Sequence, residues 1–219
     1  MTTPSAAETP RTLGDARLTI VLASENKGKL RELRALVGDI AEVHDLAPYH
    51  LTLPEETGET FAENARAKAE FVSAATGLIA LADDSGLEVD ALDGLPGVRT
   101  ARYAGEGATD AANRQKLLAA LAETPDDDRG ARFVSFVAVA RPGGETLLFA
   151  GTCDGAIGRE ERGEGGFGYD SLFVLPDGRT MAELSSEEKN AISHRGHAMR
   201  VALPALRAVL AGRVEGEVP

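Results

Sequence analysis

Short apolar runs alternate with helical patterns along this chain, and this alternation constrains the possible folds more than any other feature. Residues 18–23 form a compact apolar run that suits a buried strand, and residues 29–36 follow with apolar side chains at helical spacing. A capping box of Thr60 and Glu63 starts a second predicted helix, which Gly77 ends. Strand, polar turn and helix therefore follow one another in the first half of the chain.

The same alternation continues to the end of the chain. Residues 78–82 predict an apolar strand, residues 113–121 a helix, and residues 132–140 with residues 146–152 an antiparallel pair joined by a glycine-rich turn. A capping box of Ser185 and Glu188 starts a short helix, and a last helix follows, which Pro204 is expected to kink or to split. The sequence therefore predicts an α/β fold with a mixed central sheet flanked by helices.

The composition is that of an ordinary globular chain. It has 219 residues, of which 43% are hydrophobic and 26% charged, so a single domain over residues 18–211 is expected. Residues 1–17 are small and polar, without the apolar core of a signal peptide, and are expected to form a disordered leader; residues 212–219 are expected to form a loose tail. No apolar run approaches the length that spans a bilayer, so no membrane partner is expected.

The charge and the cysteine content exclude several classes of protein. A net charge of -12 argues against a nucleic-acid binder, which needs a basic surface to displace counterions. Cys153 is the only cysteine, so no intramolecular disulfide or cysteine zinc site can form, and a reducing, cytoplasmic setting fits best. A small polyanion is compatible with the charge, because a basic cluster marks the first predicted helix, although a solvated helix face would also explain that cluster. Its members are Lys27, Lys29, Arg31 and Arg34.

Residues 24–29 connect the first predicted strand to the first predicted helix. Unpaired backbone N–H groups and the positive end of the helix dipole favour an anion there, and Gly28 lets the backbone approach it closely. Ser24 and Asn26 add short polar donors, and Lys29 adds positive charge. The turn lacks the Walker A pattern, and on its own such a turn is more often plain helix capping.

Asp83 and Asp84 directly follow the predicted strand 78–82. Adjacent carboxylates at a strand end repel each other and lose hydration, so they normally persist where a cation or a proton offsets that cost. Mg2+ or Mn2+ would suit them, because these ions bind one or two carboxylates together with substrate phosphates. Glu55 and Glu56 offer further carboxylates, whereas a turn with capping aspartates is the simpler alternative.

Two further groups of residues suit a flat, polar ring. Phe167 and Tyr169 lie among the glycines of residues 165–170 and could stack on a base, with Asp170 accepting hydrogen bonds. A glycine-rich hairpin with a core aromatic is the alternative. The second group surrounds the predicted gap between the last two helices and comprises Lys189, His194 and Arg195. Histidine and arginine can donate hydrogen bonds there, although a helix-ending charge cluster would explain this group equally well.

Six stretches, in this order, resemble the motif series of the inosine triphosphate pyrophosphatases, also called non-canonical purine NTP pyrophosphatases. They are residues 22–29, residues 55–58 with Phe61 and residues 63–65, residues 82–87, Pro96-Gly97 with residues 101–103, residues 165–170, and residues 193–196. The resemblance is collinear from about Leu18 to Leu210. Ser24 stands where a threonine is common in that family and Glu25 where small residues are common, which adds a negative charge near the expected phosphate site.

The resemblance implies an elongated, two-lobed α/β fold with a cleft between the lobes, and a homodimer. It implies dependence on Mg2+, for which Mn2+ can substitute. It also implies hydrolysis of dITP, ITP and XTP to the monophosphate and pyrophosphate, which removes deaminated purines from the nucleotide pool. A nucleoside triphosphate is therefore the expected partner, with neither nucleic acid nor membrane involved.

The resemblance further implies roles for individual residues. Asp84 resembles the general base and a metal ligand, Glu55 the other metal ligand, and Ser85 a substrate contact. The residues that resemble the triphosphate loop are Ser24, Asn26, Lys27, Gly28 and Lys29. Those that resemble the base and sugar contacts are Phe167, Gly168, Tyr169 and Asp170, and the remaining substrate contacts are Lys189, His194 and Arg195.

These roles agree with the chemistry of phosphoryl transfer. Attack of water at the α-phosphorus builds negative charge, which Mg2+, Lys29 and Lys189 can neutralise. A carboxylate beside the metal can orient or deprotonate the water. The residues alone do not assign this task to Asp83 or Asp84, because adjacent carboxylates sharing a cation titrate as a pair, and the family pattern favours Asp84.

Selectivity would come from buried donors on His194 and Arg195, which would pair with a 6-oxygen and be left unpaired by the 6-amino group of adenine. These residues do not explain how guanine is excluded. Two other functions are compatible with the sequence. One is a related pyrophosphatase for modified pyrimidine nucleotides, and the other is a nucleotide sensor without turnover.

Overall fold

The computed structural model describes residues 18–212. The predicted leader, residues 1–17, and all of the predicted tail except Gly212 lie outside the described residues. Within residues 18–212, no helix is both long and apolar enough to cross a membrane.

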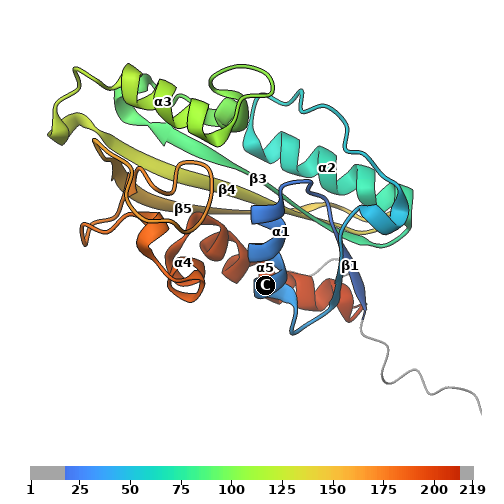
Figure 1. Ribbon diagram of the computed structural model, residues 1–219. Coiled ribbons are helices and arrows are strands. Elements are labelled where there is room, and N and C mark those ends of the chain that lie inside the picture. The colour runs from blue at the N-terminus through green and yellow to red at the C-terminus, as the bar shows by residue number, and fades with distance from the viewer. Residues whose placement is uncertain (1–17, 213–219) are drawn as a thin grey trace, which may run out of the picture.

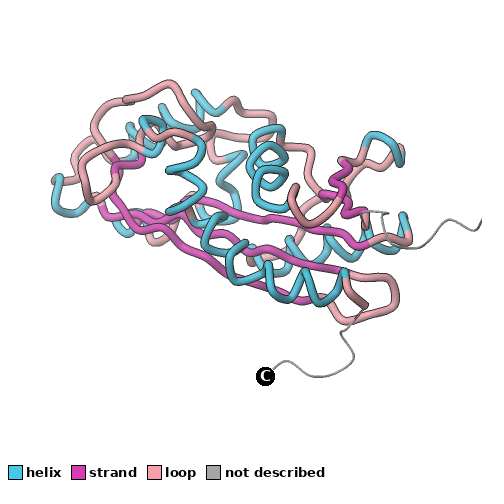
Figure 2. Tube along the Cα trace, turned by 90° about the horizontal axis from the view of Figure 1, so that it is seen from below, coloured by secondary structure: helices cyan, strands magenta, loops and turns pink. Residues whose placement is uncertain are grey.

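The strands of the described chain form one six-stranded mixed sheet in the order β2-β1-β3-β4-β5-β6. They are β1 (Thr19–Leu22), β2 (Glu42–His44), β3 (Ile79–Val89), β4 (Gly130–Ala140), β5 (Leu147–Ile157) and β6 (Phe173–Val174). Strands β2, β1 and β3 are parallel, whereas β3 to β6 pair in antiparallel fashion. The long strands β3, β4 and β5 run along the length of an elongated molecule (Figure 2). The predicted mixed central sheet is therefore confirmed.

Helices cover both faces of this sheet: α2 and α3 lie on one face, and α1, α4 and α5 lie on the other (Figure 1). They are α1 (Lys27–Val37), α2 (Phe61–Thr76), α3 (Asp110–Ala120), α4 (Ser186–Ile192) and α5 (His194–Leu210). Both predicted capping boxes are present, and Gly77 ends α2 with a φ of 68°. Helix α3 begins at Asp110 rather than at residue 113, because the Thr109 side chain accepts a hydrogen bond from the Ala112 N–H. Helix α5 is continuous, with Pro204 inside it, so Pro204 does not split this helix.

Buried apolar side chains gather in three clusters among the described residues. Two of them lie against opposite faces of the sheet at its β1 end, where Leu33 of α1 and Met199 of α5 pack on one face and Val72 of α2 packs on the other. The third includes Leu117 of α3 and Phe133 of β4, at the opposite end of the long strands. The fold therefore has two separately packed ends, joined by the long strands that cross the middle.

Strand β3 extends well beyond its predicted end. The sequence analysis ended this strand at residue 82, but the strand continues through Asp83 and Asp84 to Val89. Pairing with β4 carries it on, in a register that sets Asp84 opposite Phe136. Gly86 does not break the strand; instead, its missing side chain makes room for the Phe61 ring, which would lie 2.8 Å from a Cβ at this position. Both aspartates are therefore interior strand residues, whose side chains point to opposite faces of the sheet.

Candidate active site

A cavity of about 330 Å3 lies beside the residues that follow β1 and the middle of β3. Most residues predicted from the sequence line it: Ser24, Asn26, Lys29, Asp84, Ser85, Phe167, Gly168, Tyr169, Asp170, Lys189, His194 and Arg195. Lys27 and Glu55 are exposed side chains that do not line it, and Gly28 is buried behind Phe167. The fold thus brings segments from the front, middle and back of the chain to one place.

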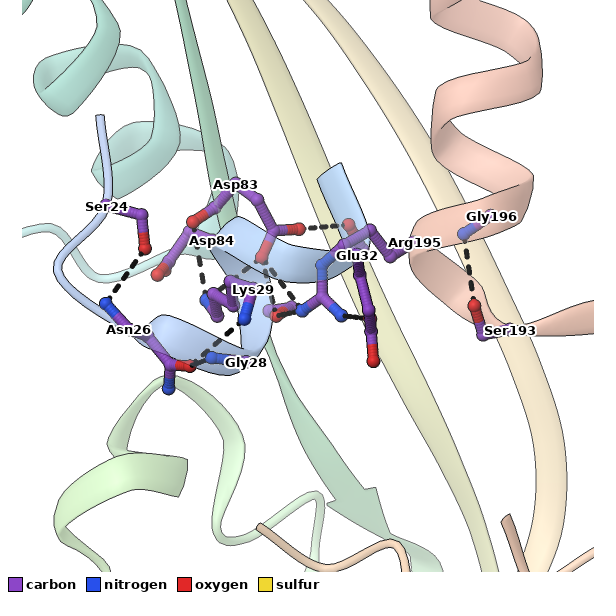
Figure 3. A network of polar contacts seen from close by, with 12 residues as sticks. Ser24, Asn26, Gly28, Lys29, Glu32, Asp83, Asp84, Ser193, Arg195 and Gly196 are labelled. Carbon is purple, nitrogen blue, oxygen red and sulfur yellow. Dashed lines mark hydrogen bonds and ion pairs between the residues drawn. The ribbon is translucent and has the colours of Figure 1, made fainter. Parts of the chain in front are cut away.

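The loop from Ser24 to Lys29 is shaped by its own side chains. The Asn26 Oδ1 atom accepts hydrogen bonds from the N–H groups of Gly28 at 2.9 Å and Lys29 at 3.1 Å, and Ser24 Oγ accepts one from the Asn26 N–H at 3.2 Å (Figure 3). Asn26 therefore caps α1, as the simpler interpretation held. A Cβ on Gly28 would come within 2.5 Å of the Phe167 ring, so the close approach that Gly28 permits in this structure is to that ring.

Asp83 points toward α1 and α5 and is surrounded by donors. Its carboxylate lies 3.0 Å from Lys29 Nζ and 3.0 Å from Arg195 Nη2, and it accepts hydrogen bonds from Ser135 Oγ at 2.5 Å and Ser85 Oγ at 2.9 Å (Figure 3). Burial opposes ionisation, but Arg195 and then Lys29 outweigh it and hold the pKa of Asp83 well below its usual range. Asp83 is therefore a fixed buried anion that orients cations of the site.

Asp84 points the other way, toward α2. Its Oδ1 atom accepts a hydrogen bond from Lys68 Nζ at 2.8 Å, and the same ammonium group lies 2.8 Å from Glu56 Oε1. Burial raises the pKa of Asp84, and the neighbouring Glu56 carboxylate adds to this effect, while the attraction of Lys68 opposes it. Asp84 is therefore the more basic aspartate, and it faces the cavity, which are the two properties that a general base for water requires.

A second buried cluster of charges lies at the other side of the cavity. Glu32 of α1 accepts hydrogen bonds from Lys189 Nζ at 2.8 Å and from Arg195 Nη1, and Lys189 also reaches Asp170. Burial opposes ionisation of Glu32, but Arg195 and Lys189 lower its pKa below the usual value. The side chains of Lys189 and Arg195 are thus held in place by carboxylates of three different segments.

The 165–170 loop presents one aromatic ring and anchors the other. The Phe167 ring lies against Gly28, with Lys189 Nζ 4.9 Å from the ring centroid. The backbone N–H of Phe167 donates a hydrogen bond to Asp170 Oδ2 at 2.8 Å. Tyr169 lines the cavity, but it is 4% exposed and its hydroxyl donates to the Thr100 carbonyl oxygen at 2.9 Å. Phe167 is therefore the better placed of the two rings to stack on a base.

His194 and Arg195 are the first two residues of α5, and each has one side-chain nitrogen without a hydrogen-bond partner among the described residues. Burial and the positive charge of Arg195 hold the pKa of His194 well below its usual value, so its ring is neutral; the ring stacks on Phe133 at 4.8 Å. Both Nη atoms of Arg195 are engaged by Glu32, Asp83 and Ser85. Within the described residues, His194 Nδ1 and Arg195 Nε have no partner. Both residues line the cavity, so a ligand bound there could satisfy these two atoms.

The sequence did not predict Lys68 or Glu32 as residues of the site, and it offered Glu56 only as a further carboxylate beside Glu55. Lys68 carries a detectable signal, because it lies in the same helical stripe as the buried Ala65, Ala69 and Val72, where a lysine needs a partner. Glu32 follows Lys29 by one helical turn and so shares its side of α1. Glu56 lies one position after the predicted Glu55 in a segment that is neither helix nor strand, and only Glu56 of the two lines the cavity.

A divalent cation fits this site only together with a ligand. No group of three or more His, Cys, Asp or Glu side chains in residues 18–212 could hold a metal ion by itself. Asp84 and Glu56 contact one ammonium group, so their carboxylates lie close together at the cavity wall. Two carboxylates that are completed by phosphate oxygens are the usual arrangement for Mg2+ in nucleotide sites.

The fold and the cavity define an α/β protein in which the loop before α1, a carboxylate with a raised pKa and an aromatic ring line one cavity. Comparison with known proteins agrees with this class. The Ham1 family matches residues 20–205. The chain therefore belongs to the Ham1 family, and the resemblance to inosine triphosphate pyrophosphatases is confirmed.

Relatives and solved structures support this assignment over most of the chain. The chain is 52% identical over 205 residues to the dITP/XTP pyrophosphatase of Nocardia farcinica, which covers 90% of this chain and 98% of that protein. It is 51% identical over 187 residues to the dITP/XTP pyrophosphatase of Exiguobacterium sibiricum, covering 84% of this chain and 94% of that one. The structure of a HAM1 protein from Coxiella burnetii matches with a TM-score of 0.78 at 46% identity, covering 89% of this chain and 99% of that chain.

Proposed function

We propose that this chain hydrolyses dITP, ITP and XTP to the monophosphate and pyrophosphate, and so removes deaminated purines from the nucleotide pool. The observation that carries the proposal is the position of Asp84: a carboxylate with a raised pKa at the wall of a cavity that the loop 24–29 also lines. Relatives about half identical to this chain bear the name dITP/XTP pyrophosphatase. A nucleotide substrate and a divalent cation are consistent with these relatives.

Asp84 acts as the general base in this proposal. It accepts a proton from the water that attacks the α-phosphorus, and the bond from that phosphorus to the bridging oxygen of pyrophosphate breaks. Lys68 stays protonated, because Asp84 and Glu56 overcome the effect of burial and raise its pKa. Its charge and that of Lys29 offset the negative charge that develops on the phosphates.

Asp84 and Glu56 would hold Mg2+, or Mn2+ in its place, together with phosphate oxygens, and the ion would neutralise charge on the transferred phosphoryl group. This assignment replaces Glu55 by Glu56, because the Glu55 side chain is exposed and Glu56 lines the cavity. Ser24, Asn26, Lys27 and Lys29 would contact the triphosphate. Lys27 would do so from the exposed rim of the loop.

The base would stack on Phe167, near His194 Nδ1 and Arg195 Nε, which have no hydrogen-bond partner among the described residues. Arg195 Nε is always a donor, and the neutral His194 can place its proton on Nδ1. A 6-oxygen satisfies such donors, whereas the 6-amino group of adenine leaves them unpaired. A homodimer, a single folded domain over residues 18–211 and a cytoplasmic setting complete the proposal.

A substrate panel tests this function. Release of pyrophosphate should be faster from dITP and XTP than from dATP, dGTP, dUTP or methylated dTTP, and it should require Mg2+. Equal or faster release from the pyrimidine nucleotides would refute the purine assignment. Asp84→Asn should lower the rate at least 100-fold while nucleotide affinity changes less, because the base is lost and the binding loop is kept. A variant as active as the wild type would instead refute the role of Asp84.

A further inference from the structure

The loop that carries Phe167 is held from outside by helix α3. The Gly168 N–H donates to Asp110 Oδ2 at 2.8 Å, and the Gly168 carbonyl oxygen accepts from Arg114 Nη1 at 2.8 Å. Gly168 lies between Phe167 and Tyr169 and has a φ of 62°. The N–H and the carbonyl oxygen of Gly168, the residue after Phe167, are therefore both held by side chains of α3.

The same face of α3 also holds the opposite wall of the cavity. Asp110, Asn113 and Arg114 are spaced three and four residues apart, so they share one side of the helix. The buried Asn113 side chain accepts from the Ala104 N–H at 2.7 Å and donates to the Ala101 carbonyl oxygen at 3.0 Å. Ala101 lines the cavity, as does Asp110.

A hydrogen bond joins the two walls directly. The Tyr169 hydroxyl donates to the carbonyl oxygen of Thr100, which also lines the cavity. Arg114 has a second partner, Glu161, whose Oε2 atom lies 2.9 Å from Arg114 Nε. The 165–170 loop and the segment around Thr100 are thus joined to each other through Tyr169, and both are also held by side chains of α3.

We propose that Asp110 and Arg114 are positioning residues that hold the Phe167 loop in place at the base end of the cavity. This inference rests on the proposed function, because that function assigns the base to the Phe167 loop. Neither side chain is bonded to Asp84 or Lys68 in the described structure, so both act on nucleotide binding and not on the chemical step. Without them, the substrate must order a loop that the wild-type protein already holds in place.

Steady-state kinetics with dITP tests the proposal in four variants: Asp110→Ala, Asp110→Asn, Arg114→Met and the double variant Asp110→Ala/Arg114→Met. Loss of each hydrogen bond should raise KM about threefold, and the double variant should show a rise of about tenfold, with kcat within twofold of the wild type. Asparagine should restore the wild-type KM, because its amide oxygen still accepts from the Gly168 N–H. Asp110→Ala and Asp110→Asn remove the same charge from the first turn of α3, so a helix-dipole effect would be equal in both.

Hydrogen exchange of residues 165–170 provides a measurement that does not depend on turnover. Exchange should be faster in the double variant than in the wild type, and Asp110→Asn should exchange like the wild type. An unchanged KM and unchanged exchange in the double variant would overturn the proposal, as would a fall in kcat as large as the rise in KM. If wild-type protein released no pyrophosphate from dITP, the proposed function would fail, while the exchange experiment would still decide whether α3 holds the loop.

Discussion

Replacement of Lys68 by methionine should destabilise the fold far more than loss of a typical surface charge. Lys68 is 7% exposed and contacts Asp84, also 7% exposed, at 2.8 Å, and Glu56, 31% exposed, at 2.8 Å. At this distance one pair of charges attracts by about 1.5 kcal/mol in water and by about 6 kcal/mol at an effective dielectric constant of 20. Methionine keeps most of the aliphatic stem, so the change removes mainly the charge.

Breaking a buried ion pair by removing one partner costs about 3–5 kcal/mol, because the remaining charge is buried without compensation. We expect a loss of about 3 kcal/mol in the free energy of unfolding at pH 8, the lower end of that range, since the partly exposed Glu56 can regain water. The loss should shrink as the pH falls. Without Lys68, burial and Glu56 are opposed mainly by Lys29 and raise the pKa of Asp84 further. A raised native pKa adds stability as the pH falls through it.

Urea unfolding at pH 8 and pH 5 measures this effect. Arg66→Met is a matched control on the same helix, because Arg66 lies 3.5 Å from Glu70 with side chains 44% and 50% exposed, and such a surface pair contributes at most about 1 kcal/mol. If Lys68→Met cost no more than Arg66→Met, or cost more at pH 5 than at pH 8, the argument for an uncompensated buried carboxylate would be wrong.

Three further predictions follow from the same geometry. Gly28→Ala should raise KM for dITP at least fivefold and lower the free energy of unfolding by about 1–3 kcal/mol, because the methyl group would displace the half-buried Phe167 ring; unchanged kinetics would contradict this. Asp83→Asn should make stability less sensitive to acid, since the lowered pKa of Asp83 gives stability that is present above its unfolded pKa and is lost as the pH falls through its native pKa; acid titrations of both proteins by circular dichroism check this. Chelation with EDTA should abolish pyrophosphate release from dITP, and added Mg2+ or Mn2+ should restore it; activity that survives dialysis against EDTA would argue against the metal role of Asp84 and Glu56.

Local signals predicted those parts of the fold that local interactions determine. Helix α2 is an example, because a capping box at Thr60 fixes its start and a left-handed Gly77 fixes its end. The end of β3 could not be read in this way. Its continuation to Val89 depends on pairing with β4, which lies some fifty residues further along the chain. It also depends on Lys29 and Lys68, which pair with the buried Asp83 and Asp84 only in the folded protein.

In the candidate site, too, the sequence predicted what local patterns determine and not what tertiary contacts determine. The sequence brought out cavity-lining residues from two loops, strand β3 and three helices, and their individual roles stay predictions. It could not distinguish Glu55 from Glu56, because residues 51–58 belong to neither a helix nor a strand and no repeating pattern fixes which of the two faces inward. Once β3 is known to continue, strand alternation separates Asp83 from Asp84, which the sequence alone left as an undivided pair.

The opposite orientation of these two aspartates has a consequence for how the chain acquires its structure. Asp83 contacts Lys29 of α1 and Arg195 of α5, which lies 112 positions later in the chain. Asp84 contacts Lys68 of α2, on the other face of the sheet. During synthesis β3 is complete long before α5 leaves the ribosome. Until α5 docks, the Asp83 carboxylate lacks its Arg195 partner, so we expect it to stay hydrated. Docking of the last helix and burial of that strand are therefore coupled events, and a chain that stops before residue 194 should fail to close its core on this face rather than fold into a smaller version of the protein.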